Sequence, residues 1–135
     1  MDILMFRGHF KPLLESKIKE DSLKELYDLF EDSAVIEFPY QSKELPNRLN
    51  GIEEIKNYYK DWSSIFQFDD FQVTITKVND DHIYAETKSL GRIIPTNKPY
   101  NQHYISILHT NPTTKKIIKY IEIFNPTIIQ DSFNQ

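Results

Sequence analysis

This chain of 135 residues lacks cysteine, and it contains only three glycines. The absence of cysteine excludes both a disulfide framework and thiolate chemistry. Three glycines leave little to build a nucleotide-binding loop, and the sequence contains no Walker loop, no dinucleotide fingerprint and no G-x-S-x-G nucleophile elbow. The usual signatures of phosphate-binding, dinucleotide-dependent and serine-dependent enzymes are therefore missing.

An excess of positive charge and a long apolar run are missing too. The formal net charge is −4, with both signs dispersed along the chain, so the electrostatic footprint of a nucleic-acid-binding protein is absent. The basic cluster of Lys115, Lys116 and Lys119 flanks a predicted turn, and we interpret it as solvated. No segment approaches the ~20 apolar residues of a membrane span, and Met1–Phe10 has no signal-peptide pattern. We therefore expect a cytoplasmic protein that binds neither nucleic acid nor membrane.

The four histidines, at positions 9, 82, 103 and 109, do not have the spacing of metal ligands. They form no H-x-x-x-H or H-E-x-x-H pair. His103 and His109 would share one side of a strand but lie roughly 20 Å apart, which is too far to hold one metal ion. We therefore expect neither a metal site nor a cofactor.

Aromatic side chains, in contrast, are abundant: nine Phe, eight Tyr and one Trp. Each buries roughly 150–250 Å². A chain of this length must pack them in its core, line a cavity with them or bury them against a partner. The length itself fits a single domain over residues 1–135.

The hydrophobic periodicity predicts helices before strands. A first helix is expected near residue 11, and a second is capped by Ser22 and Glu25, with a buried stripe that ends at Phe30. A strand over residues 34–38 follows. The strongest helical pattern places apolar side chains at three- and four-residue steps from Ile52 to Phe66.

After residue 70 the hydrophobic period changes to two. This alternation predicts four antiparallel strands, at about residues 71–76, 82–90, 100–110 and 116–125. Early helices and late strands indicate an α+β fold with the helices on one face of the sheet. A long helix across a strongly curved sheet would leave a cone with an open end, where a pocket could form.

Glu122 is the most informative carboxylate of the chain. It lies in the middle of a predicted strand that is apolar on both faces, and alternation puts it on the same side as Tyr120 and Phe124. A carboxyl group among aromatic side chains is desolvated, which raises its pKa toward the range useful for proton transfer. The alternative is a solvent-facing glutamate on a sheet edge. Glu86 is a weaker candidate, for which an ion pair with Lys or Arg is the simpler explanation.

Four motifs in order carry a resemblance to a known family. They are Phe30-x-Asp32-x-Ala34-Val-Ile-Glu-Phe38-Pro39, Leu45-Pro-Asn-Arg48-Leu-Asn-Gly51, Tyr100-x-Gln102-x-Tyr104 and Tyr120-Ile-Glu122-Ile-Phe-Asn125-Pro126. Together they resemble the SnoaL-like branch of the nuclear transport factor 2-like superfamily, and most closely the phenazine biosynthesis A/B proteins, over roughly residues 22–133.

The resemblance implies a cone-shaped α+β barrel of cystatin-like topology, with N-terminal helices packed on a strongly curved, mostly antiparallel sheet. It also implies a homodimer that packs through the outer face of the sheet, supplied here by Ile105, Ile107, Ile121 and Ile123. Members of the superfamily include polyketide cyclases, ketosteroid isomerases, epoxide hydrolases and condensing enzymes. The fold alone therefore does not decide the function.

The resemblance assigns a role to Glu122, which occupies the acid/base position of the closing E-x-x-N-P motif of the phenazine proteins. The histidine on their long helix is replaced here by Tyr58. Phe38 stands where ketosteroid isomerases have their base, so their activity is not expected. The implied pocket suits a planar or cyclic, partly oxygenated ligand. Its lining is Phe38, Tyr58, Trp62, Gln102, Tyr104, Ser106, Tyr120, Glu122 and Phe124.

Three functions remain open from the sequence. The first is a cofactor-independent acid/base enzyme, of isomerase, cyclase or condensing type, in which Glu122 moves a proton on a cyclic carbonyl-containing substrate while Tyr58 or Tyr104 holds the oxygen. The second is a binding or carrier protein that uses the same pocket without chemistry. The third is a dimeric interaction or accessory domain whose cone is filled by its own side chains. A cavity too small for a few waters would favour this third function.

Overall fold

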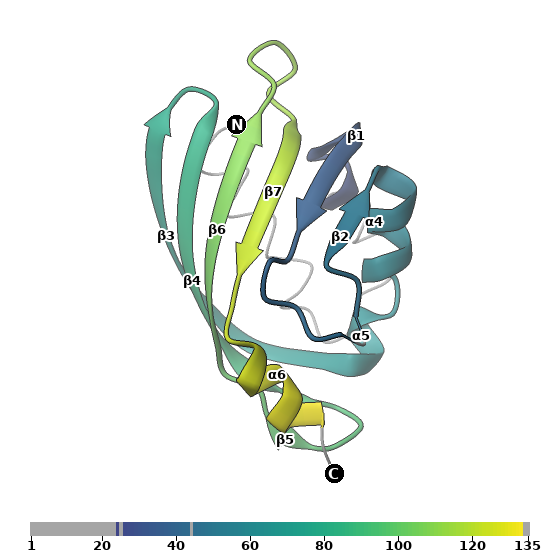
Figure 1. Cartoon of the computed structure of the whole chain (residues 1–135). Helices are drawn as coiled ribbons and strands as arrows, with labels where there is room; N and C mark the ends of the chain where they lie inside the picture. The colour runs from purple at the N-terminus through teal and green to yellow at the C-terminus, as the bar shows by residue number, and fades with distance from the viewer. Residues whose placement is uncertain (1–23, 25, 44, 134–135) are drawn as a thin grey trace.

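The computed structural model describes residues 24, 26–43 and 45–133, except the side chains of residues 62, 63, 71 and 73. Within these ranges the fold is α+β, as predicted, and none of the helices has the length and apolar composition that a membrane span requires. Its elements are shown in Figure 1 and are β1 (Phe30–Glu37), β2 (Arg48–Asn50), α4 (Ile52–Tyr59), α5 (Trp62–Ile65), β3 (Phe66–Asn79), β4 (His82–Ile93), β5 (Lys98–Pro99), β6 (Gln102–Thr110), β7 (Ile117–Ile123) and α6 (Pro126–Phe133).

The strands form one mostly antiparallel sheet in the order β2-β1-β7-β6-β4-β3, with β5 paired to β4. The pair of β1 and β7 is parallel, and the other pairs of the described sheet are antiparallel. β3 and β4 curve strongly and bring one end of the sheet round beneath α5 (Figure 1). The predicted curved, mostly antiparallel sheet is therefore confirmed.

The curvature has a local cause in the pairing of β3 with β4. The register between them shifts between Phe68 and Asp70, and irregularities of this kind bend a strand and increase its twist. Gly91 lies opposite this shift, and a Cβ atom there would be 2.1 Å from the carbonyl oxygen of Gln67. The close approach of the two backbones therefore requires glycine at position 91.

The core lies on the concave face of the sheet, where burial alternates along each strand as the pleat requires. On β6 the side chains of residues 102, 104, 106, 108 and 110 are buried, while the intervening ones are exposed or half-buried. α4 packs Ile55 and Tyr59 toward this interior. Fully buried apolar side chains of the core include Ile36, Phe38, Ile55, Ile83, Ile93, Leu108 and Ile117.

The helix predictions are correct in part. The helix expected near residue 11 lies outside the described residues. The next helix ends at Tyr27, and Phe30, expected in its buried stripe, instead begins β1. The amide of Ile117 donates to the carbonyl of Leu29 at 2.8 Å, which holds this segment beside β7. Tertiary pairing thus overrides the local helical pattern.

The long helix predicted from Ile52 to Phe66 is wrong in its extent. α4 ends at Tyr59, α5 adds a single turn, and Phe66 is the first residue of β3, opposite Ile93. The hydroxyl and the amide of Ser64 both donate to the carbonyl of Asp61, which starts a new turn there. The four predicted late strands are present as β3, β4, β6 and β7, whereas α6 was not predicted.

We predict that Gly91→Ala lowers the free energy of unfolding by about 3 kcal/mol, because the added methyl group forces β3 and β4 apart. Urea unfolding monitored by circular dichroism measures the change. Leu90→Ala is the matched control, since Leu90 is 47% exposed and its truncation leaves the two backbones in place. Equal stability of the two variants would contradict the role given to Gly91.

Candidate functional site

Glu122 lies on β7 with its side chain turned into the interior, where only 9% of its surface is exposed. β7 is an inner strand, paired with β1 on one side and with β6 on the other, and its register places Glu122 opposite Ser106. Tyr120 and Phe124 are buried on the same side. None of the ion pairs among the described residues includes Glu122.

Burial raises the pKa of Glu122 from 4.5 to about 7, because the carboxylate loses hydration that no neighbouring cation of the described chain replaces. A hydrogen bond from the Tyr120 hydroxyl lowers this pKa and offsets part of the effect. The Tyr120 oxygen also lies 3.0 Å from the Ser106 hydroxyl. Either hydroxyl can be the donor in this pair, and when Tyr120 gives its proton to the ionised Glu122, Ser106 is the donor.

Further tyrosine hydroxyls surround the carboxyl group. The hydroxyl oxygens of Tyr100 and Tyr104 are 3.0 Å apart, and Tyr58 accepts a hydrogen bond of 3.5 Å from the Gln41 amide. Burial raises the pKa of Tyr100 to about 12, and raises the pKa values of Tyr58 and Tyr104 as well. At neutral pH these hydroxyls therefore keep their protons and can serve as hydrogen-bond donors.

The cavity at Glu122 is small, with a volume of about 20 Å³. This volume is sufficient for about one water molecule. Most of the described residues that line the cavity are aromatic. Apart from the tyrosines, Glu122 is the one titratable side chain among them. Its lining is Leu45, Tyr58, Phe66, Tyr100, Tyr104, Glu122, Phe124, Ile129 and Phe133.

A larger groove of about 630 Å³ adjoins this cavity and shares the side chains of Leu45, Tyr58, Phe66 and Phe133 with it. It is bounded mainly by α4, by the segment before it and by the end of α6. Three carboxylates lie along it, from Glu53, Glu54 and Asp61. The rest of its lining is Pro46, Leu49, Asn57 and Ile65.

The structure brings four of the predicted site residues to the cavity: Tyr58, Tyr104, Glu122 and Phe124. Phe38 lies behind them, with its ring 5.3 Å from that of Tyr58. Tyr120 and Ser106 form the hydrogen-bonded pair described above, next to Glu122. The side chain of Trp62 is outside the description.

Gln102 is buried, but its amide group is engaged with the backbone. Its Nε2 donates to the carbonyl of Asn125 at 2.9 Å, and its Oε1 accepts from the Asn125 amide at 3.1 Å. Gln102 thus fixes the chain where β7 leads into α6. These two hydrogen bonds hold the neighbouring Phe124 in position. Gln102 itself is not among the residues that line the cavity.

Several lining residues were not among the candidates. Tyr100 has the same alternation as Gln102 and Tyr104, so the sequence contained a signal for it. Ile129 and Phe133 come from α6, and no helix was predicted there. Leu45 lies in an irregular segment, for which periodicity gives no information.

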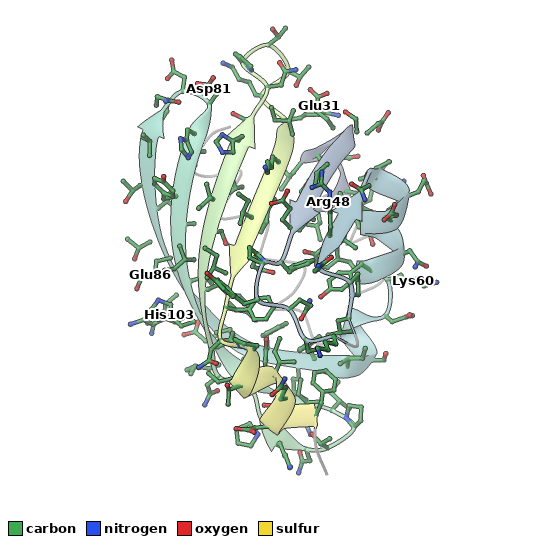
Figure 2. All side chains as sticks on the ribbon, viewed as in Figure 1. Glu31, Arg48, Lys60, Asp81, Glu86 and His103 are labelled. Atoms are coloured by element: carbon green, nitrogen blue, oxygen red, sulfur yellow. The ribbon has the colours of Figure 1, made fainter. Side chains whose placement is uncertain are left out.

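Glu86, the weaker candidate, lies on the outer face of the sheet. Its carboxylate is 3.2 Å from Nε2 of His103, and both side chains are about half exposed. Figure 2 shows the two residues on neighbouring strands at the outer side of the sheet, away from α4. Its partner is a histidine rather than the expected Lys or Arg, and the pair belongs to the surface.

No family model matches the chain. A curated relative, the uncharacterized protein YesE of Bacillus subtilis (strain 168), is 31% identical over 116 residues, which cover 84% of this chain and 78% of YesE. Among solved structures, a Bacillus subtilis protein provisionally named an isomerase matches with a TM-score of 0.78 and 28% identity, over 98% of this chain and 96% of its own.

Two further solved structures share the fold at low sequence identity. One is a nuclear transport factor 2-like protein of unknown function from Exiguobacterium sp. 255-15, with a TM-score of 0.68 and 16% identity over 90% of this chain and 98% of its own. The other is a phenazine biosynthesis-related protein from Pseudomonas aeruginosa, with a TM-score of 0.63 and 13% identity over 98% of this chain and 85% of its own. The predicted resemblance in fold is confirmed.

We predict that the stability of the protein falls as Glu122 ionises. The pKa of this carboxyl group is higher in the folded than in the unfolded chain, so between about pH 4.5 and 7 the folded state binds more protons. The free energy of unfolding therefore decreases over this interval, by about 3 kcal/mol from this group alone. Above pH 7 Glu122→Gln should be more stable than the unmodified protein, because an amide has no charge to desolvate.

Urea unfolding between pH 4 and 9 measures this difference. Asp70→Asn serves as the control, since it removes an exposed carboxylate from β3 of the same sheet. Its pH dependence should follow that of the unmodified protein. If Glu122→Gln also follows it, then Glu122 is not the desolvated group described above.

Proposed function

We propose a proton-transfer function for this chain, which belongs to the same family as the Bacillus subtilis protein YesE and to the nuclear transport factor 2-like superfamily. The observation that carries the proposal is the buried carboxyl group of Glu122 beside tyrosine hydroxyls. The name of the Bacillus subtilis isomerase structure, at 28% identity, supports the same class of reaction. The proposed substrate is a small organic molecule with an acidic C–H bond next to a carbonyl group.

The proposed mechanism needs only the chain's own side chains. The carboxylate of Glu122 removes the proton, and tyrosine hydroxyls donate hydrogen bonds to the oxygen on which negative charge develops. Tyr104 and Tyr58 line the same cavity as Glu122 and supply such donors. The protonated Glu122 then returns the proton to another carbon, which completes an isomerisation. A pKa of about 7 suits both steps, since each form of the carboxyl group is well populated near neutral pH.

The size of the cavity favours a second candidate, the accessory domain with a filled interior. A volume of about 20 Å³ holds about one water and no substrate. We prefer the enzyme because the adjoining groove shares Leu45 and Phe133 with the cavity, and both side chains are 38% exposed. Rotation of these two side chains would join the groove to Glu122 without disturbing the sheet.

The proposal predicts that the protein catalyses exchange of α-protons in D₂O. Cyclohexenone and related cyclic ketones are incubated with the protein, and deuterium incorporation is followed by ¹H NMR. Glu122→Gln should lower the rate by about 10²–10⁴-fold, which is the usual contribution of a general base.

Glu86→Gln is the control and should keep the full rate. Exchange that persists in Glu122→Gln would overturn the proposed role of Glu122. Absence of exchange with every ketone, combined with a single conformation of the closed cavity in NMR spectra, would favour the accessory domain.

We also propose that two copies associate through the outer face of the sheet. The outward side chains of β4, β6 and β7 make an apolar strip there, in which Ile105 is 45% and Tyr84 40% exposed. Ile107, Ile121 and Ile123 are half-buried beside them. Exposed apolar strips of this kind mark association sites.

Ile105→Asp should convert the proposed dimer to a monomer, because the interface would have to bury the new charge unpaired. Light scattering coupled to size-exclusion chromatography measures the mass. Val78→Asp is the matched control, since Val78 is 50% exposed and lies outside the strip, and it should leave the mass unchanged. A monomeric mass for the unmodified protein would refute the proposal.

A further inference from the structure

We propose that the ligand of this site carries a positively charged amino or ammonium group, seated in the groove beside α4 among carboxylates and aromatic rings. The proposed ligand class rests on the proposed function in one respect, namely that the ligand binds next to Glu122. It draws on the chemistry of the groove and on the carboxyl group beneath it.

Among the described residues that line the groove, the charged side chains are all acidic. Glu53, Glu54 and Asp61 contribute carboxylates, and no lysine or arginine is among the described lining residues. These three carboxylates take part in none of the ion pairs of the described chain. Glu54 accepts a hydrogen bond of 3.2 Å from the Asn50 amide, which orients it without neutralising it. Within the described part of the chain, no basic side chain of the lining offsets the negative charge of the groove.

Three lysines on or beside the bounding helices have contacts or positions away from the groove lining. Lys56 of α4 places its Nζ 5.8 Å from the centre of the Tyr27 ring. Lys98 donates to the carbonyl of Asp131, on the exposed side of α6. Lys60 follows α4, and Figure 2 shows it at the outer edge of the molecule, beyond the helix. None of the three is among the lining residues of the groove.

Aromatic rings supply the second half of the site. Tyr58, Phe66 and Phe133 line the groove, and the rings of Phe66 and Phe133 meet edge to face with centres 6.0 Å apart. The faces of such rings attract organic cations through the ring quadrupole. An inorganic cation would keep its water and gain little from them, and a neutral ligand would gain at most hydrogen bonds from the carboxylates. An organic ammonium ion uses both.

Glu122 adds a fourth carboxyl group behind the shared wall of Tyr58 and Phe66. It is buried without a cationic partner in the described chain, so a nearby positive charge would stabilise its ionised form. An organic anion would meet the opposite effect from all four groups. Binding of a cation should therefore be coupled to loss of a proton from Glu122.

A charge series of benzyl compounds tests the inference. Benzylammonium, benzyl alcohol and benzoate share one ring and carry charges of +1, 0 and −1 at pH 7. Affinities are measured by isothermal titration calorimetry, supported by NMR titration. We expect benzylammonium to bind about tenfold more tightly than benzyl alcohol, and benzoate to bind most weakly. Equal affinities across the series would overturn the proposal.

A double variant locates the site. Glu53→Gln combined with Asp61→Asn should weaken benzylammonium binding about tenfold and leave benzyl alcohol within about twofold, because only the charge of the groove changes. Asp80→Asn combined with Glu86→Gln makes the same change of net charge away from the groove, and it should leave both affinities unchanged. Equal loss in the two double variants would show an unspecific charge effect and overturn the site.

Proton release gives an independent measurement. Titrations at pH 7 in buffers of different ionisation enthalpy should show release of up to about half a proton for each benzylammonium bound, since Glu122 is about half protonated there. Glu122→Gln should abolish this release. Release that persists in the variant would remove Glu122 from the inference.

The outcomes separate this inference from the proposed function. Preference for benzylammonium without any ketone exchange would support the ligand class and refute the enzyme. Ketone exchange that depends on Glu122, with no preference for charge in the benzyl series, would support the enzyme and refute the ligand class.

Discussion

The candidate site depends on one unfavourable interaction, the removal of the Glu122 carboxyl group from water. The position of β7 inside the sheet enforces it, because β1 and β6 pair with both of its edges. A slip of one residue in either pairing would turn Glu122 to the outer face and bury Ile121 or Ile123 instead. The hydrogen-bonded chain from Ser106 through Tyr120 provides part of the solvation that the carboxylate has lost. A carboxyl group held in this way titrates near neutral pH while the rest of the core stays apolar.

The tyrosines and the carboxyl group influence one another's protonation. The charge of Glu122 is, after burial, the next largest cause that raises the pKa values of Tyr58, Tyr59 and Tyr120. These hydroxyls therefore remain protonated whenever the carboxylate is ionised, and a site with one base keeps several donors available. A cation nearby would stabilise the ionised form of Glu122, which burial disfavours. Through the charge of Glu122 it would also change the pKa values of these tyrosines.

Much of this arrangement was predictable from alternation along the strands. The remaining features were not predictable, and each has an identifiable physical reason. The period of two placed Tyr120, Glu122 and Phe124 on one side of a strand. The helical period failed at Phe66, because its spacing suits a helix while its backbone pairs with Ile93. α6 begins with Pro126 after Asn125, whose side chain accepts from the Thr127 amide. An Asn-Pro pair of this kind can start a helix, although it was interpreted only as the end of a strand.

The contrast between the small cavity and the acidic groove bears on how such a site could work. A carboxyl group beside a cavity with room for about one water acts as a base only when it is ionised, and its burial opposes that ionisation. Carboxylates at the rim cannot reverse this effect, because a negative charge does not stabilise a second one. A positive group placed between rim and interior would satisfy both sets of carboxylates at once. Burial favours the protonated form of Glu122, and the rim carboxylates attract a cation. The arrangement is therefore consistent with a site in which Glu122 becomes ionised when a cation binds.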